Sequence, residues 1–290
     1  MKFEEGDQFC RAAIAAVIRD GQRAAPRGKA VLELTEPIVL TLTDPTRPFL
    51  MSPARRANYR FGMAEACWIA SGSDSLSTIA KYNSRMKEFS DDGERLWGAY
   101  GPRLIEQLQH VVSILQRDPD SRQAVLTTWR PMVPATLRPL SPSWDGASWR
   151  SKDVPCTVAW HFMIRNGKLN LSVFMRSNDA WLGTPYDILS FTTVQRAVAS
   201  ILCIEVGAYN HVVSNLHLYE ENVADAQRLL LSEPVASVAL PGFNFASISD
   251  MTLAFASALA GGIAWSSNPG VDAYAAVIHK RPGAIGVPVR

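Results

Sequence analysis

The chain has 290 residues, 47% of them apolar, so it is long enough to bury one large core or two smaller ones. Its 29 Lys and Arg against 27 Asp and Glu exclude the basic excess that is typical of a nucleic-acid-binding domain. No apolar run approaches the roughly 18 residues of a membrane span. The N-terminal MKFEEGDQFCRAA also lacks the basic start and apolar run of a signal peptide. The composition predicts a soluble cytoplasmic protein without nucleic-acid or membrane partners.

The first half of the chain predicts helices and short strands. Residues 8–19 have a helical period that ends at Gly21. VLEL and IVLTL, residues 31–34 and 38–42, are strand-like. The next two predicted elements are helices, a buried one over 62–70 and an amphipathic one over 104–115.

The second half begins with a strand period, at residues 124–129, 157–164 and 168–175. Asn166-Gly167 between the last two is a strong signal for a two-residue hairpin. Long helices are predicted over Pro185–Val206 and Leu218–Leu231, and the Pro-, Ser- and Trp-rich segment Val133–Asp153 is predicted to be a loop. Because no linker divides the chain, we expect one α/β domain over residues 1–290.

Four cysteines, Cys10, Cys67, Cys156 and Cys203, are isolated from one another and from metal-ligand spacing with the five histidines. This pattern predicts a reducing compartment and no metal. Cys156 follows a proline at the start of a strand. It is either a small buried apolar residue or a thiolate nucleophile, and the second role requires a nearby cation. Counting outward from the hairpin places Cys156 near Ser177 and allows Arg176 to approach the sulfur.

Three arginines, Arg27, Arg122 and Arg176, each lie beside small or polar residues. Converging guanidiniums and a hydroxyl such as that of Ser177 suit a phosphate monoester. The alternative is that all three are solvated surface charges.

Taken together and in order, several stretches resemble the thymidylate synthase family. They are GMAEACWIASG, GAYG, DPDSRQAVLTTWRP, PCT, NGKLNLSVFMRSNDAWLGTPYDI and SNLHLYEEN. The resemblance is clearest over residues 27–225 and weaker over 232–290. It implies a mixed β-sheet packed with helices in one domain.

The resemblance also implies a role for each matching residue. Cys156 aligns with the nucleophile that adds to C6 of a pyrimidine. Such an addition pushes electron density onto C5, which then becomes nucleophilic. Glu65 aligns with the glutamate that organises proton transfer through water. Tyr100 aligns with the tyrosine that is implicated in removing the C5 proton. Asp179 and Gly183 are expected at the folate, with Asp179 against the pterin.

The nucleotide contacts follow from the same resemblance. Arg27, Arg176 and Ser177 would hold the phosphate, and His217 with Tyr219 the sugar hydroxyl. Arg122 would reach the phosphate site of a partner in a homodimer. The implied ligands are a pyrimidine nucleoside monophosphate and 5,10-methylenetetrahydrofolate as co-substrate.

Asp187 is the informative departure from the family. Thymidylate synthases have asparagine in the matching Pro-Phe-Asn-Ile motif, and its amide matches N3–H and O4 of uracil. Here the motif is Pro-Tyr-Asp-Ile. A carboxyl group accepts from the N4 amino group of cytosine and shares a proton with N3, on either the acid or the ring. The alternative for Asp187 is a helix N-cap.

The aspartate, with MRSND before it, resembles the cytidylate 5-hydroxymethyltransferase branch. In that branch water captures the exocyclic methylene and gives 5-hydroxymethylcytidylate and tetrahydrofolate. Two departures favour a wetter site: residues 83–89, NSRMKEF, lack a tryptophan, and the chain ends in GVPVR. Gln123 replaces a second family arginine, which weakens the expected partner phosphate contact.

Three questions stay open from the sequence. The first is whether the reaction is a hydroxymethylation or a reductive C5-methylation of cytidylate or uridylate, which would use the same residues. A catalytically silent nucleotide- or RNA-binding relative belongs to another functional class. The choice between CMP and dCMP, and with it the pathway, is not decided, although Ser177 slightly favours dCMP.

Overall fold

The computed structural model describes residues 1–130, 151–261, 268–281 and 285–287. Its helices are α1 Gly6–Asp20, α2 Tyr59–Ala70, α3 Leu76–Ile79, α4 Tyr100–Arg117, α5 Thr184–Ile201, α6 Glu220–Leu231, α7 Ile248–Ala260 and α8 Pro269–Ile278, with 3-10 turns η1 Pro26–Gly28 and η2 Ser84–Phe89. Its strands are β1 Lys2–Phe3, β2 Gln22–Ala24, β3 Val31–Glu33, β4 Ile38–Leu42, β5 Val125–Thr127, β6 Thr157–Arg165, β7 Lys168–Met175, β8 Asn178–Asp179, β9 Glu205–Val213 and β10 Leu216–Tyr219.

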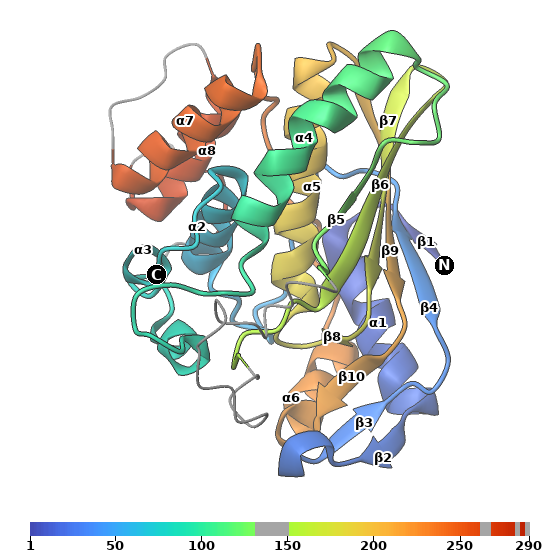
Figure 1. Cartoon of the computed structure of the whole chain (residues 1–290). Coiled ribbons are helices and arrows are strands. Elements are labelled where there is room, and N and C mark those ends of the chain that lie inside the picture. The colour runs from blue at the N-terminus through green and yellow to red at the C-terminus, as the bar shows by residue number, and fades with distance from the viewer. Residues whose placement is uncertain (131–150, 262–267, 282–284, 288–290) are drawn as a thin grey trace.

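The strands form two sheets (Figure 1). The larger has the order β1-β4-β9-β7-β6-β5, and the smaller has the order β2-β3-β10-β8. In the larger sheet β7 is antiparallel to β6 and parallel to β9. The predicted mixed sheet with packed helices is therefore confirmed.

The β6–β7 hairpin fixes the centre of the larger sheet. Asn166 and Gly167 both have positive φ, 53° and 72°, as the predicted two-residue turn requires. Arg165 pairs with Lys168 as expected. Leu169, Leu171 and Val173 alternate inward and are fully buried, because successive side chains of a strand point to opposite faces.

Helix α5 packs against the inner face of this sheet, and α2 packs between α5 and the α7–α8 pair (Figure 1). Gln195 of α5 is fully buried, and its amide donates to the carbonyls of Leu169, Gly207 and Ala208. This contact attaches α5 to β7 and β9. It therefore fixes the position of the α5 N-terminus along the sheet, beside β8. The buried apolar side chains from Phe9 to Val287 form one continuous cluster.

Two predicted helices were too long. The helix predicted to reach Val206 ends at Ile201, and β9 begins at Glu205. The chain turns at Cys203, between the helix and the strand, with a positive φ of 53°. No Gly or Pro in the sequence indicates this turn. The helix predicted from Leu218 begins at Glu220, because Leu216–Tyr219 pairs with β3 and β8 instead. Most of the predicted loop at 133–153 lies outside the described residues.

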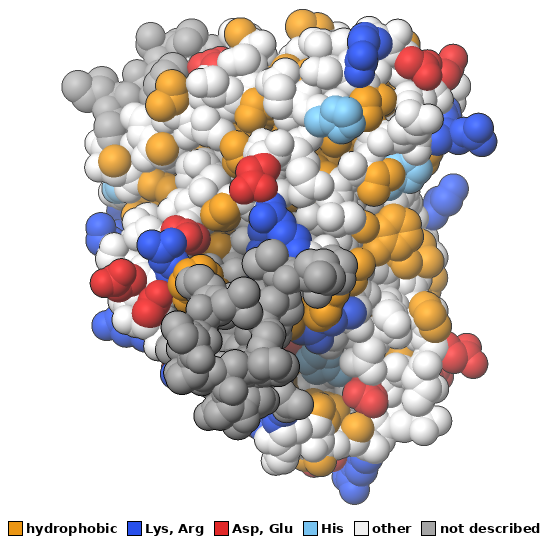
Figure 2. Space-filling view, in the orientation of Figure 1, with side chains coloured by type: hydrophobic (Ala, Val, Ile, Leu, Met, Phe, Trp, Pro, Cys, Tyr) orange, Lys and Arg blue, Asp and Glu red, His pale blue; other side chains and the backbone are white. Residues whose placement is uncertain are grey.

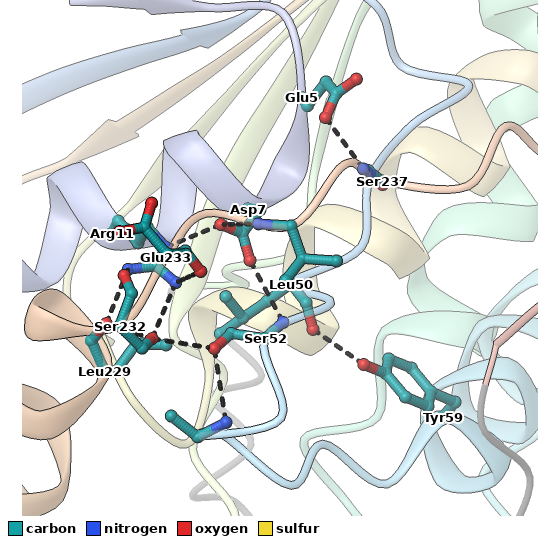
Figure 3. Close-up of polar contacts among 12 residues, drawn as sticks. Glu5, Asp7, Arg11, Leu50, Ser52, Tyr59, Leu229, Ser232, Glu233 and Ser237 are labelled. Carbon is teal, nitrogen blue, oxygen red and sulfur yellow. Dashed lines mark hydrogen bonds and ion pairs between the residues drawn. The ribbon is translucent and has the colours of Figure 1, made fainter.

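A buried polar cluster joins α1 to the segment after α6 (Figure 3). Arg11 forms an ion pair of 2.6 Å with Asp7, and its guanidinium donates to the carbonyls of Leu229, Ser232 and Glu233. The carboxylate of Asp7 also accepts from the main chain of Ser52. The charge of Arg11 is thus neutralised and fully hydrogen-bonded, as a buried guanidinium requires.

Among the described residues, the outer face of the larger sheet has no Asp, Glu, Lys or Arg at its centre, where a row of neutral polar side chains crosses the strands at His161, Ser172, Asn210 and Thr41. Val39, Val125 and Phe174 point away from the helices and are 47%, 44% and 41% exposed. In Figure 2 apolar side chains gather toward the right of the view, on the side where the strands lie. No helix in the described part of the chain is long and apolar enough to cross a membrane.

Candidate active site

The predicted site residues come from elements that meet at one end of the inner sheet face. Cys156 immediately precedes β6, and Asp187 lies in the first turn of α5. Glu65 lies within α2, and Tyr100 is the first residue of α4. The charge of Asp187 is close enough to act on each of the other three groups, so the structure brings them together.

Cys156 lies opposite Arg176, one position from the predicted partner Ser177. The pairing of β6 with β7 shifts by one residue at Val158, so Thr157 faces Met175. The main-chain N–H of Arg176 then donates to the Cys156 carbonyl at 2.9 Å. A β-bulge adds a residue to one strand only, and a count from the turn cannot include it.

Arg176 is held against the thiol by its own hydrogen bonds. Its Nε donates to the Pro155 carbonyl at 2.9 Å, and its Nη2 donates to Val154 O and lies 3.7 Å from Cys156 Sγ. Burial raises the pKa of the Cys156 thiol, and the charges of Arg176 and, more weakly, Arg27 lower it. The site therefore supplies the cation that a thiolate nucleophile needs.

Asp187 faces a polar partner from β8. Its Oδ2 accepts from Nδ2 of Asn178 at 2.6 Å. The N-cap of α5 is Gly183, and Asp187 makes no capping bond, so the N-cap alternative is wrong. Burial raises the pKa of Asp187 to about 7, with Asp179 adding to the rise and Asn178 opposing it. Near neutral pH this carboxyl group can therefore both donate and accept.

Glu65 and Tyr100 are the other proton-handling groups of the site. Burial, together with the smaller effect of the nearby Asp187 charge, raises the pKa of Glu65 to about 8. Burial also raises the pKa of Tyr100 well above its usual value, followed by the charges of Cys156 and Asp187. Both groups are therefore protonated at neutral pH, which suits exchange of protons with a bound ring or water.

Asp179 lies shortly before α5, and only one of its two carboxylate oxygens is hydrogen-bonded within the described structure. Its Oδ1 accepts from the main-chain N–H groups of Trp181 and Leu182 at 2.7 and 2.9 Å. Its Oδ2 is buried and has no partner among the described residues. Because buried polar atoms are normally paired, this oxygen is suited to a donor on a ligand. Burial is also the main cause of the raised pKa of Asp179.

Gly183 packs directly against the hydrogen-bonded side chains of Asn178 and Asp187. A Cβ at this position would lie 2.9 Å from Asn178 Nδ2 and 3.2 Å from Asp187 Oδ2. The residue is therefore glycine because the Asn178–Asp187 contact occupies that space. This packing role is independent of the folate contact that we expected for it.

The remaining predicted residues are a group of three neighbouring side chains and two arginines. Ser177 Oγ lies 3.3 Å from His217 Nδ1, and the rings of His217 and Tyr219 stack edge to face. Arg27 lies in η1 with φ 55° and is exposed, yet it is close enough to act on Cys156. Arg122 is exposed in the turn before β5 and has no hydrogen bond or ion pair with the site in the described structure.

Sequence reasoning missed three buried members of the site. Asn178 accepts at Oδ1 from Thr184 Oγ1 at 2.5 Å and from His211 Nε2 at 2.9 Å. His211 Nδ1 in turn lies 2.6 Å from the hydroxyl of Tyr209. The only sequence signal was that Tyr209 and His211 occupy inward positions of β9, next to the inward Val213.

Comparison with known proteins identifies the family. Residues 12–254 match the family model for thymidylate synthase. The chain belongs to the thymidylate synthase family. Within the described residues of this family member, no group of three or more His, Cys, Asp or Glu side chains is arranged to hold a metal ion.

Its relatives include phage proteins named deoxyuridylate hydroxymethyltransferase. The protein from Bacillus phage SP01 is 34% identical over 222 residues, which cover 71% of this chain and 55% of the relative. That from Pseudomonas phage M6 is 29% identical over 240 residues, 80% of this chain and 65% of the relative. That from Delftia phage PhiW-14 is 31% identical over 194 residues, which cover 64% of this chain and 54% of the relative. The chain thus matches between about half and two thirds of the length of these relatives.

Proposed function

We propose that this protein transfers a hydroxymethyl group to C5 of a cytidine monophosphate, CMP or dCMP, with 5,10-methylenetetrahydrofolate as the one-carbon donor. The observation that carries the proposal is the Asp187 carboxyl group, which aligns with the base-reading asparagine of the family and whose pKa burial raises to about 7. Asparagine, which the uracil-specific enzymes use there, offers a fixed donor and acceptor. A half-protonated carboxyl group offers the reverse pairing for cytosine.

Cys156 begins the proposed reaction. Its thiolate, supported by Arg176, adds to C6 of the ring, and C5 becomes a nucleophile. Folate supplies the methylene group that C5 attacks. Water that Tyr100 and Glu65 order accepts the C5 proton and passes it to solvent. Water then adds to the exocyclic methylene that remains after tetrahydrofolate leaves, and the Cys156–C6 bond breaks to release 5-hydroxymethylcytidylate.

The ligand contacts follow from the free groups of the site. The unpaired Oδ2 of Asp179 is suited to the N–H groups of a pterin, and Gly183 lies beside it. Arg27 and Arg176 with Ser177 form the phosphate site, and Arg176 already has its guanidinium oriented by main-chain carbonyls. His217 and Tyr219 hold the sugar hydroxyl.

Deoxyuridylate is the second candidate substrate, because the phage relatives are named for it. Both candidates give a hydroxymethyl product, and the base decides between them. The catalytically silent alternative is disfavoured because Cys156, Glu65, Tyr100 and Asp179 are all present and converge on one site.

Product analysis tests the proposal. The protein is incubated with methylenetetrahydrofolate and, separately, CMP, dCMP, UMP and dUMP, and products are identified by mass spectrometry. We expect a 5-hydroxymethyl product from a cytidylate and no dihydrofolate absorbance change at 340 nm. A 5-methyl product with dihydrofolate would establish the reductive alternative, and product from dUMP alone would establish deoxyuridylate. Tight nucleotide binding without turnover would establish the silent relative.

We also propose that a second copy of the chain covers the outer face of the larger sheet. Phe174, Val39 and Val125 expose apolar surface there, and the inner strands carry no charged side chain at the centre of this face. Arg122 lies at the edge of the same sheet, just before β5. This placement suits the expected reach of Arg122 into the phosphate site of the partner.

A further inference from the structure

A chain of buried hydrogen bonds runs from β9 through β8 to the base-reading carboxyl group. It joins Tyr209 to His211 at 2.6 Å, His211 to Asn178 at 2.9 Å and Asn178 to Asp187 at 2.6 Å. Tyr209 and His211 are fully buried, and Asn178 is 4% exposed. Neither Tyr209 nor His211 has a place in the mechanism described above.

The direction of this chain is fixed at Tyr209. Among the residues that the structure describes, His211 Nδ1 is the only hydrogen-bond partner of the Tyr209 hydroxyl. If the hydroxyl accepted from His211, its own proton would be buried without an acceptor, which is costly. Tyr209 therefore donates to Nδ1. Burial lowers the pKa of His211 to about 3, so the ring is neutral and its single proton is on Nε2.

Each later link follows from the one before. His211 Nε2–H donates to Asn178 Oδ1, which also accepts from Thr184. The Asn178 amide cannot rotate by 180° without placing its N–H groups against the Nε2–H of His211, the obligate donor of the two. Its Nδ2 must therefore face Asp187 and donate to Oδ2. In a neutral carboxyl group the carbonyl oxygen is a better acceptor than the hydroxyl oxygen, so this short hydrogen bond to Oδ2 favours the proton on Oδ1.

We propose that Tyr209 and His211 are positioning residues that act through Asn178 to fix the polarity of Asp187, with Oδ2 as acceptor and Oδ1 as donor. A donor–acceptor pair of fixed polarity matches the edge of one pyrimidine and opposes the other. Resting on the cytidylate function proposed above, the match is Oδ1–H to N3 and N4–H to Oδ2. The proton that sequence alone left on either the acid or the ring is thus assigned to the acid.

Other titratable groups around Asp187 do not supply this polarity. Glu65 from α2, Tyr100 from α4, Cys156 before β6 and Asp179 from β8 face the same space. None of them has a hydrogen bond to either Asp187 oxygen in the described structure. Among the described residues, only the Asn178 amide bonds one Asp187 oxygen and not the other.

The test compares Tyr209→Phe with Tyr274→Phe. Each change removes one hydroxyl from a fully buried tyrosine, and the Tyr274 hydroxyl bonds Thr193 far from this chain of bonds. The readout is the ratio of kcat/KM for dCMP to that for dUMP, which a loss of folded protein does not change. We expect Tyr209→Phe to lower this ratio roughly tenfold, as one unpaired buried acceptor would. Tyr274→Phe should leave it as in the wild type.

His211 provides a second comparison and a direct view of the proton. His211→Gln keeps a donor near Nε2 and should retain the preference, whereas His211→Leu should lose it. In ¹⁵N NMR, His211 should show the Nε2–H tautomer and no titration between about pH 5 and 8. A Nδ1–H tautomer, or an unchanged ratio in Tyr209→Phe, would overturn the inference.

The outcomes separate this inference from the function on which it rests. A wild type that prefers dUMP refutes cytidylate recognition. The tautomer of His211 and the comparison of the two Tyr→Phe variants still decide whether the chain of bonds sets base preference. A wild type that prefers dCMP with an unchanged Tyr209→Phe ratio refutes the inference alone.

Discussion

Arg176 lies beside Cys156, with Nη2 3.7 Å from the sulfur and its main-chain N–H bonded to the Cys156 carbonyl. Because Arg176 is the strongest influence that lowers the pKa of this buried thiol, we expect Arg176→Gln to raise that pKa by roughly one unit. The measurement is the rate of Cys156 alkylation by iodoacetamide against pH, resolved by peptide mass spectrometry. Arg165→Gln at the other end of the hairpin is the control, and exposed Cys203 is an internal reference. An unmoved alkylation profile in Arg176→Gln would count against this role.

Asp187→Asn should reverse base preference. The amide restores the donor and acceptor that match uracil, so the ratio of kcat/KM for dCMP to that for dUMP should fall by about 10- to 100-fold. Asp272→Asn, which changes an acidic residue in the first turn of another helix, is the matched control. If Asp187→Asn kept the wild-type ratio, Asp187 would not read the ring edge. Wild-type turnover of a cytidylate should also decline as pH rises through about 7, since the donor form of Asp187 is then lost.

Gly183→Ala should disturb the same recognition through packing. The added methyl group would approach Asn178 Nδ2 to 2.9 Å and Asp187 Oδ2 to 3.2 Å, and one of the two must move. We expect a loss of about 1–3 kcal/mol in the free energy of unfolding and a weaker base preference. Gly242→Ala is the control because a Cβ there meets nothing within 4 Å. Urea unfolding and the kcat/KM ratio measure the two effects, and equal behaviour of both variants would contradict the argument.

Glu65 should make stability depend on pH. Its pKa is raised from 4.5 to about 8 in the folded protein. Between these values the unfolded chain has released a proton that the folded chain keeps. The free energy of unfolding therefore falls as pH rises, by about 1.4 kcal/mol for each unit. Glu65→Gln should stabilise the protein more at pH 8 than at pH 5, whereas the control Glu221→Gln should not. Urea unfolding at both values is decisive, and the same increment for Glu65→Gln at each pH would refute the expectation.

The outer sheet face should control assembly. Analytical ultracentrifugation of the wild type should show a dimer, and Phe174→Lys should weaken it by placing a charge in the covered surface. Leu253→Lys changes an even more exposed apolar residue, on α7, and should leave the mass unchanged. A monomeric wild type would remove the basis for Arg122 acting on a partner.

Local signals predicted much of the fold. The Asn166-Gly167 hairpin was correct because the turn needs positive φ at both residues, which these types adopt readily. The end of α5 was missed because apolar residues continue through Ile204 and Val206, and the turn at Cys203 has no Gly or Pro. The strand β10 was missed because only its pairing with β3 and β8, distant in sequence, distinguishes it from a helix start.

The site was predictable where one residue carries the chemistry. Cys156, Asp187 and Arg176 follow from what each side chain can do at its place in a recognised motif. The contacts of Asn178 with His211, 33 residues apart, depend on how β8 and β9 meet at the sheet end. A one-residue bulge at Val158 was likewise invisible, yet it decides which side chain faces the thiol.

The guanidinium of Arg11 has a consequence for how the chain is made. Its acceptor at Glu233 lies 222 residues further on. At about 5–20 residues per second, a ribosome needs about 10–45 s to synthesise that interval. Throughout this time the first helix has its charged side chain without the carbonyls that will surround it. The hydrogen bonds around this buried guanidinium are therefore completed only after the region following α6 has emerged, which makes its burial a late step of cotranslational folding.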